Sequence, residues 1–366
     1  MYPTLRNDDK IYRICRELST FSSLPDGQLR QEITASIEIY YKDLSEFDSS
    51  LPKHLIQGLE ATWLEFTCVT VHICNILSNH CLSQAQGAAM ARHIDILYRV
   101  DDWMEGVCDR YGVRDLCAAT TLFNDCLSLY IGVDPSRSNQ SLSHTRSDSP
   151  LSQDPPIYHL ALLSQDFQTI LRLMHSHPMP TTHPQDRQWY TLELHSFFAA
   201  QISRLAALPP IHKSPSSIYS WTIDIGARSV GTKYMFAMFS CLISTDTESP
   251  CWATPLETYL AQDFAQQLSV EFRLLNDIGG RERDEKDGTM SSCLLVHSGE
   301  TAGLEEIAKY ARDCSHVLLD RIEETLARRL GAQEAEKRRL LLEMYRRTVR
   351  LSGELYMANE PNRTAL

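Results

Sequence analysis

Residues 255–284 read PLETYLAQDFAQQLSVEFRLLNDIGGRERD, a long apolar run that ends in a charged segment. Its apolar side chains recur at steps of three and four, which predicts a long helix that starts near Pro255. A pair of glycines then breaks the pattern, and a charged run follows. Asn276, Gly280 and Asp284 fall at positions i, i+4 and i+8, so a helix stacks them on a single face.

The same helical period dominates the rest of the chain. Convincing alternating strands are absent, and proline-rich runs separate the periodic segments. The pattern therefore predicts an all-α fold of roughly ten helices, built by helix-on-helix packing. Helices are expected at about 54–77, 88–107, 114–133, 157–174, 187–207, 254–280, 303–330 and 334–357.

One segment interrupts this pattern. Residues 134–156 read DPSRSNQSLSHTRSDSPLSQDPP, with too few apolar groups to order themselves, which predicts a flexible Ser- and Pro-rich surface insertion. Helical segments of the same character flank it, so it does not mark a domain boundary. We expect residues 1–50 to pack on a single helical domain formed by residues 51–366.

Composition excludes several classes of protein. The chain has 366 residues, 43% hydrophobic content and a formal net charge of −12. That charge argues against nucleic-acid binding and against attachment to acidic lipid. No apolar run has the length of a signal peptide or a membrane span, so a cytoplasmic location is the default expectation. An anionic substrate remains compatible if metal ions lie between it and the carboxylates.

Two acidic motifs are candidates for a metal site. The first, VDDWME at 100–105, ends a long apolar run, and Asp101 and Glu105 stack one helical turn apart beside Asp102. Burying these carboxylates is costly unless cations compensate, although they could also form a solvated helix end. The second motif is the face that carries Asn276. Its oxygen ligands suit Mg²⁺, although a charged helix C-terminus would explain the same residues.

The two motifs together resemble those of class I terpene synthases. The second motif is most similar to that of kaurene-synthase-like diterpene cyclases of microbial or fungal type, with Arg273-Leu-Leu-Asn-Asp-Ile278 and Gly280 in register. The DxDD motif of class II cyclases is absent, so the resemblance implies a lone class I α domain: a helical bundle around a central active-site cavity. Glu105, Gly280 and Asp284 depart from the residues usual in the family, and Glu285 is an alternative to Asp284.

The resemblance also implies roles for individual residues. Three Mg²⁺ ions would be held by one set of side chains and the diphosphate by another, with a water serving at Gly280. The expected metal ligands are Asp101, Asp102, Glu105, Asn276, Gly280 and Asp284. The expected diphosphate-binding residues are Arg273, Arg283 and Arg228, the last at a helix break between Gly226 and Gly231. Asp101, Asp102, Arg228 and Tyr356 are the expected catalytic residues, and Trp103 and Tyr356 are expected to line the cavity.

The implied activity is Mg²⁺-dependent ionisation of a prenyl diphosphate, followed by cyclisation of the carbocation to a diterpene. Geranylgeranyl diphosphate and a bicyclic copalyl-type diphosphate are the expected substrates. Three alternatives stay open: a sesquiterpene synthase acting on farnesyl diphosphate, a chain-elongating prenyltransferase and an inactive helical scaffold. A homodimer is also compatible with the sequence.

Overall fold

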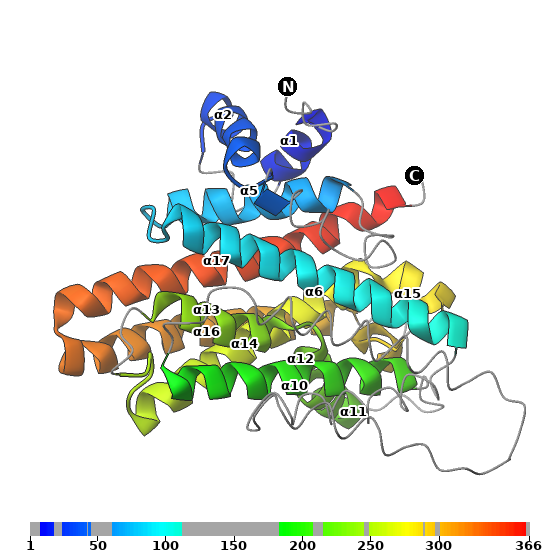
Figure 1. Cartoon of the computed structure of the whole chain (residues 1–366). Coiled ribbons are helices and arrows are strands. Elements are labelled where there is room, and N and C mark those ends of the chain that lie inside the picture. Colours follow the sequence, from blue (N-terminus) through cyan, green and yellow to red (C-terminus); the bar gives the residue numbers. More distant parts are fainter. Residues whose placement is uncertain are drawn as a thin grey trace, which may run out of the picture.

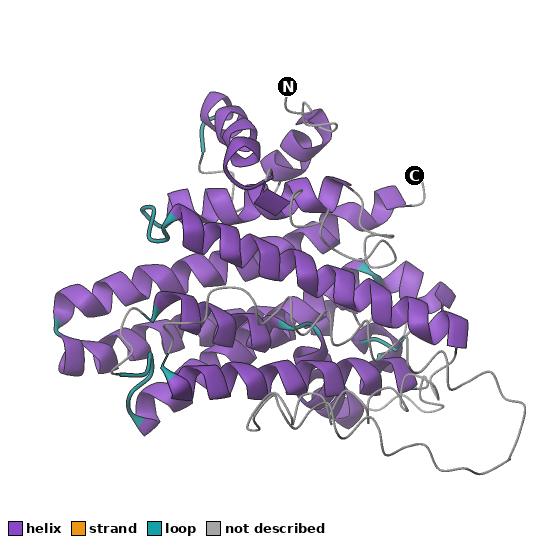
Figure 2. Ribbon diagram, viewed as in Figure 1, coloured by secondary structure: helices purple, strands orange, loops and turns teal. Residues whose placement is uncertain are grey.

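The structure, a computed structural model, describes residues 8–17, 24–41, 43–44, 61–111, 183–207, 215–244, 249–287, 290–296 and 301–363. Every regular element in these ranges is a helix, which confirms the all-α prediction (Figure 2). None of the described helices is long and apolar enough to cross a membrane. The helices expected at 114–133 and 157–174, and the insertion at 134–156, lie outside the described residues.

Long helices form the body of the molecule (Figure 1). α14 packs against α16 and α17, α17 packs against α5, and α5 packs against α6, while α10 and α13 pair beside them. Six of these helices cover ranges that the apolar period predicts. The bounds are α5 Ala61–Leu77, α6 Gln84–Tyr111, α10 Pro184–Ala206, α13 Thr232–Ile243, α14 Pro255–Gly279, α16 Thr301–Leu330 and α17 Ala332–Arg363.

Short helices connect or cover this body. α11 (Pro215–Ser220), the π-helix η3 (Trp221–Gly226) and α12 (Ala227–Ser229) lead into α13, and α15 (Arg281–Asp287) and the 3₁₀ helix η4 (Ser292–Leu295) follow α14. Near the N-terminus, α1 (Asp8–Glu17), α2 (Asp26–Ser36) and the π-helix η1 (Ile37–Tyr41) lie on the α5 side of the bundle (Figure 1).

The start of α14 is fixed by local chemistry. The Thr254 hydroxyl accepts a hydrogen bond from the Glu257 backbone N–H at 3.2 Å, and the Glu257 carboxylate accepts one from the Thr254 N–H at 3.3 Å. This reciprocal pair satisfies two helix N–H groups that would otherwise lack partners, and Pro255 pre-sets the first turn. Glu257 also pairs with Arg329 of α16 at 2.7 Å, which ties the two helices together.

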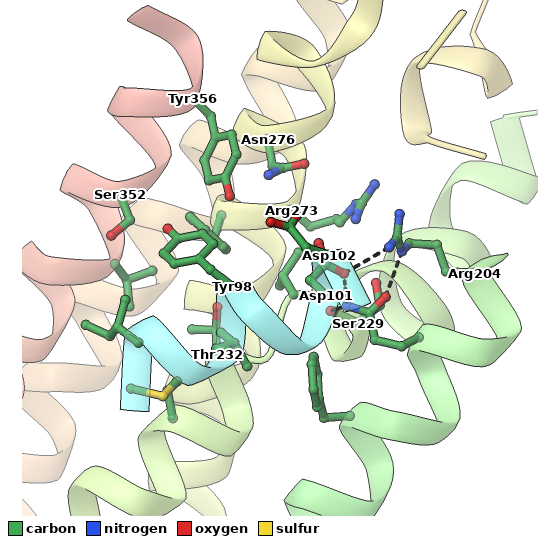
Figure 3. A pocket seen from close by; sticks show the side chains of 18 of the residues that line it. Tyr98, Asp101, Asp102, Arg204, Ser229, Thr232, Arg273, Asn276, Ser352 and Tyr356 are labelled. Atoms are coloured by element: carbon green, nitrogen blue, oxygen red, sulfur yellow. Dashed lines mark hydrogen bonds and ion pairs between the residues drawn. The ribbon is translucent and has the colours of Figure 1, made fainter. Parts of the chain in front are cut away.

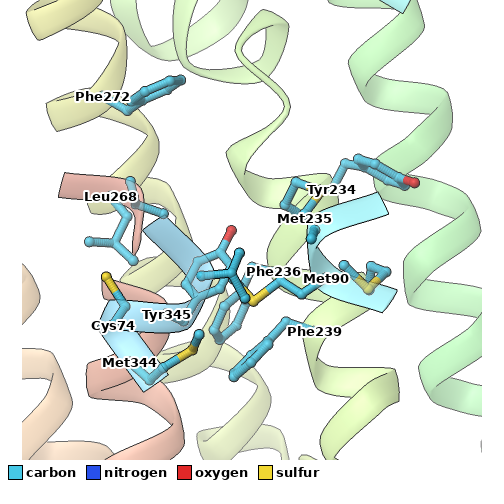
Figure 4. Close-up of a cluster of buried hydrophobic side chains, with 14 of the residues drawn as sticks. Cys74, Met90, Tyr234, Met235, Phe236, Phe239, Leu268, Phe272, Met344 and Tyr345 are labelled. Atoms are coloured by element: carbon cyan, nitrogen blue, oxygen red, sulfur yellow. The ribbon is translucent and has the colours of Figure 1, made fainter. Parts of the chain in front are cut away.

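The centre of the bundle is an aromatic core around α13 (Figure 4). The Phe236 ring lies 6.1 Å from that of Trp252, 5.7 Å from Phe264 and 5.2 Å from Tyr345. α13 is buried on nearly every side: ten of its twelve residues are buried, and most of its side chains are apolar. It has no broad solvent-facing polar side of the kind that marks a surface helix, and no helix is expected there from the sequence.

Backbones of α14 and α17 approach closely where α14 ends. A Cβ atom at Gly279 would lie 2.7 Å from the backbone oxygen of Tyr356, and one at Gly353 would lie 2.8 Å from a methyl of Leu275. Two glycines, one on each helix, therefore allow a contact that no larger residue permits. This contact sets the position of Tyr356 relative to the end of α14.

Alanine substitutions at Gly279 and Gly280, which are adjacent in the chain, are expected to have unequal effects on stability. Gly279→Ala forces a methyl against backbone atoms of α17, so we expect about 1 to 3 kcal/mol loss in the free energy of unfolding. Gly280→Ala meets the mobile end of Arg283 at 2.9 Å and the Asn276 carbonyl at 3.1 Å, so a smaller loss is expected. Chemical denaturation of both variants measures this, and equal losses would contradict the close helix contact.

Candidate active site

A cavity of about 440 Å³ lies between α6, α10, α14 and α17, and the segment joining α12 to α13 closes one wall. Its lining changes along α6. Met90, Ile94 and Leu97 are apolar, whereas Asp101 and Glu105 are charged. At 1.5 Å per residue, the step from Met90 to Glu105 covers about 22 Å of helix. The cavity therefore has an apolar end and a charged end.

Both acidic motifs of the sequence meet at the charged end (Figure 3). Asp101 on α6 and Asn276 on α14 line the same space, although 175 positions separate them. The side chains gathered there carry four carboxylates, three guanidiniums and two amides: Asp101, Asp102, Glu105, Asp284, Arg204, Arg273, Arg283, Gln201 and Asn276. Opposite charges thus share one chamber instead of facing bulk solvent separately.

The first motif is held by α10. Nη2 of Arg204 donates to Oδ1 of Asp101 at 3.0 Å and to Oε1 of Glu105 at 2.8 Å, and Nε2 of Gln201 donates to the same Asp101 oxygen at 2.5 Å. Burial raises the pKa of Asp101 above its ordinary value, and Arg204 only partly offsets that rise. Asp102 also lines the cavity, but its side chain is more exposed.

Neighbouring residues of the second motif have different surroundings: one faces the cavity and the next is buried and paired. Asn276 faces the cavity, and its amide has no hydrogen-bond partner among the described residues. Asp277 is fully buried, pairs with Arg273 one turn back and accepts a hydrogen bond from the Ser292 N–H at 2.7 Å. Nε of Arg273 is buried without a partner. The Asn276 amide therefore has unused bonding capacity in the cavity, and the Arg273 guanidinium has one buried donor without a partner.

The spacing of this motif survives the end of α14. The Gly280 N–H donates to the Asn276 carbonyl at 2.8 Å, and the Asp284 N–H donates to the Gly280 carbonyl at 2.9 Å. These bonds continue the helical pattern into α15, so Asp284 reaches the cavity one turn further on. Gly280 itself does not line the cavity. Glu285 is exposed and paired with Arg281 at 2.8 Å, so the structure favours Asp284 over Glu285.

Asp284 sits in a less favourable environment for charge than a surface carboxyl. Only 2% of the residue is exposed, and its partner Arg283 lies 3.2 Å away. Burial raises the pKa of Asp284 to about 6, although Arg283 opposes the rise. The free carboxylate is thus costly in this structure, because the cost of burial exceeds the stabilisation that Arg283 and Arg273 provide.

Arg228 is not at the cavity, which corrects the expected position of this residue. Its side chain is exposed, whereas the next residue, Ser229, is buried and lines the cavity. Successive residues of a helix point about 100° apart, so α12 turns Ser229 inward and Arg228 outward. The expected helix break is present: Gly231 has a φ of +70° and precedes α13.

Aromatic rings form a wall next to the charged end. Tyr356 of α17 lies 6.4 Å from the ring of Tyr98 and 5.8 Å, edge to face, from the ring of Phe272, and all three line the cavity. The expected role of Tyr356 as a lining residue therefore fits. Trp103 was expected beside it, but it belongs to the hydrophobic core and does not line the cavity. It follows Asp102 on α6, on the face that packs inward.

Four of the lining residues that sequence reasoning missed lie at or beside the charged end. Tyr98 stands three positions before Asp101 and Phe272 four before Asn276, so helical spacing could have identified both. Gln201 and Arg204 lie about one hundred positions from Asp101, and no pattern connects them with the acidic motif. Only the packing of α10 beside α6 brings them there.

The donor set fits a hard cation such as Mg²⁺, with shared ligation. Within the described residues, no three His, Cys, Asp or Glu side chains converge closely enough to hold a metal unaided. Mg²⁺ usually takes one or two carboxylates and completes its shell with waters and substrate phosphate oxygens. Asp101 on one side, and Asn276 and Asp284 on the other, supply that kind of partial ligation.

Comparison with known proteins finds partial relatives. No protein-family model matches the chain. Ent-kaur-16-ene synthase of Phaeosphaeria sp. (strain L487) is 27% identical over 162 residues, and pimaradiene synthase pbcA of Emericella nidulans is 32% identical over 95 residues. The matches cover 41% and 25% of this chain but 17% and 10% of those proteins, so the chain spans a small part of their length.

Among solved structures, a cucumene synthase variant is similar with a TM-score of 0.47 and 14% sequence identity, over 84% of this chain and 94% of that one. Relatedness is indicated by the sequence matches to ent-kaur-16-ene synthase and pimaradiene synthase alone. Over the aligned parts, the chain is similar to terpene synthases.

The raised pKa of Asp284 predicts a pH-dependent difference between wild type and Asp284→Asn. Between the ordinary value of 3.8 and about 6, the folded state binds more protons than the unfolded state, so wild type loses stability as pH rises. The amide variant has no such loss. In metal-free buffer, its free energy of unfolding should gain on the order of 2 kcal/mol relative to wild type across this range.

Denaturation curves at pH 4 and pH 7 measure this difference. Asp224→Asn, at an exposed position in η3, is the matched control and should follow wild type. A constant difference between Asp284→Asn and wild type at both pH values would show that Asp284 titrates normally.

Proposed function

We propose that this chain is a class I terpene cyclase that ionises a prenyl diphosphate with the help of Mg²⁺ and guides the carbocation to a cyclic product. One observation carries the proposal: two acidic motifs from distant helices face the charged end of one cavity whose other end is apolar. A diphosphate with a long hydrocarbon chain has the same two-part character. The similarity to two named terpene synthases supports the same activity.

At the charged end, Asp101 would hold metal from α6, with Asp102 and Glu105 beside it, and Asn276 and Asp284 would hold metal from the α14–α15 side. Bound Mg²⁺ supplies Lewis-acid stabilisation of the negative charge that develops on a departing diphosphate. Arg273 and Arg283 line the same end and would bind the diphosphate oxygens directly.

The apolar end has the complementary task of keeping water from the cation. Methionine and aliphatic side chains line much of it, and such side chains do not hold water by hydrogen bonds. The rings of Tyr98, Phe272 and Tyr356 stand between this end and the carboxylates. Their π faces can stabilise positive charge as it moves away from the leaving group. Tyr356 is therefore assigned to cation stabilisation and not to proton transfer.

We infer a diterpene-forming activity on a twenty-carbon substrate, either geranylgeranyl diphosphate or a copalyl-type diphosphate. This choice rests on the resemblance of residues 273–284 to the kaurene-synthase-like motif and on the name of the Phaeosphaeria relative. Farnesyl diphosphate is the alternative substrate, because the same charged end would serve a shorter chain.

Purified protein incubated with Mg²⁺ and each of the three diphosphates tests the proposal. Gas chromatography of the extract should show a cyclic hydrocarbon from a twenty-carbon substrate, and chelation with EDTA should abolish it. Product from farnesyl diphosphate alone would reassign the substrate. An elongated diphosphate would indicate a prenyltransferase, and no turnover would mean an inactive scaffold.

Substitution of one ligand on each side of the cavity should stop turnover without unfolding the chain. Asp101→Asn and Asn276→Ala each remove a metal ligand, so we expect kcat/KM to fall more than about 100-fold. Asp224→Asn, outside the cavity, should retain wild-type activity. Folding is checked by circular dichroism. Full activity with unchanged Mg²⁺ dependence in both cavity variants would place the site elsewhere.

A further inference from the structure

The back of the charged end is built by α10, and Arg204 is its central residue (Figure 3). Its side chain is 6% exposed, whereas those of its partners Asp101 and Glu105 are 38% and 43% exposed. The cation is therefore fixed in the wall, and the two carboxylates reach past it into the cavity. Nε of Arg204 donates to Oε1 of Gln201 at 2.8 Å, which orients the guanidinium.

Gln201 connects this cluster to the opposite wall. Its Nε2 donates to Asp101 at 2.5 Å and to the backbone carbonyl of Ser229 at 2.7 Å. Ser229 ends α12, directly before the break at Gly231. The position of Asp101 is thus coupled through one amide group to the segment that leads into α13.

Charge balance explains why a guanidinium stands there. Asp101 and Glu105 repel each other at one helical turn, and burial makes that repulsion stronger than in water. Burial lowers the pKa of Arg204, but the charges of Asp101 and Glu105 more than offset this, so the guanidinium stays protonated. With no metal bound, Arg204 is the cation that holds the two carboxylates together.

We propose that Arg204 is a positioning residue that acts as the internal counter-ion of the first acidic motif, competes with divalent cations for Asp101 and Glu105, and offers its positive charge to the anionic diphosphate once those cations are bound. The inference rests on the proposed function, because it assigns Mg²⁺ and diphosphate to this cavity. It adds a residue from α10 that neither acidic motif contains.

The proposal predicts that replacing Arg204 shifts the Kd for Mg²⁺ and the Kd for diphosphate in opposite directions. Replacing Arg204 with a neutral side chain frees Asp101 and Glu105, so Mg²⁺ alone should bind more tightly. The same change removes a positive charge from the chamber, so inorganic diphosphate in saturating Mg²⁺ should bind more weakly. If Arg204 had only a packing role, its replacement would weaken the binding of both ligands or leave the binding of both unchanged. We expect about a tenfold change in each Kd, which corresponds to about 1.4 kcal/mol.

Titration calorimetry of full-length Arg204→Met with Mg²⁺, and then with inorganic diphosphate in saturating Mg²⁺, measures both constants. Arg187→Met is the matched control, because it makes the same change at an exposed position on α10 and should leave both constants unchanged. If Arg204→Met does not fold, Arg204→Lys replaces it. That variant should show the same two shifts at smaller size, because an ammonium cannot donate from a rigid planar fork.

The outcomes separate this inference from the proposed function. Tighter Mg²⁺ binding with weaker diphosphate binding supports the inference, whether or not a prenyl substrate is turned over. Parallel shifts, or none, in a protein that cyclises a prenyl diphosphate would overturn the role of Arg204 alone. A wild-type protein that binds neither Mg²⁺ nor diphosphate would overturn both.

Discussion

The charged end of the cavity depends on placing opposite charges within one enclosed space. Carboxylates that line a cavity lose part of their hydration, and each then needs a cation or a donor nearby. The structure supplies these from several helices: Arg204 from α10 for Asp101 and Glu105, and Arg283 from α15 for Asp284. If the carboxylates stood on the surface, water would satisfy them and no such arrangement would be required. The pairing therefore indicates that these carboxylates are kept inside the cavity, where a ligand could contact them.

Helix packing then determines how the charges can meet. α14 and α17 touch at Gly279 and Gly353, where the absence of side chains brings the ends of the two helices together. That contact places Tyr356 beside Phe272 and opposite Tyr98, so an aromatic wall stands next to the carboxylates. The rigid core around α13 supports the opposite side of the cavity. Small residues at the contact and large rings behind it thus give the cavity its two different ends.

Much of this arrangement follows from the sequence, and the part that does not has a physical cause. The period of three and four predicts six long helices, and the i, i+4, i+8 spacing predicts that Asn276 and Asp284 share a face. α13 lacks a broad polar side because ten of its twelve residues are buried. The sequence pattern does not identify Arg204, because its partners Asp101 and Glu105 lie on another helix. The outward direction of Arg228 depends on the rotation of α12, which spacing along the chain does not determine.

Backbone geometry after α14 determines which of two neighbouring acidic side chains, Asp284 or Glu285, lies at the cavity. Backbone hydrogen bonds run unbroken from Asn276 through Gly280 to Asp284, so α15 continues the helical spacing past the glycines. Asp284 is almost fully buried beside the cavity, while the longer Glu285 is exposed and bound to Arg281. Glu285 has the longer side chain, but it points away from the cavity and therefore cannot take the place of Asp284. Because burial also raises the pKa of Asp284, a cation placed in the cavity would stabilise the charged form of this carboxyl group.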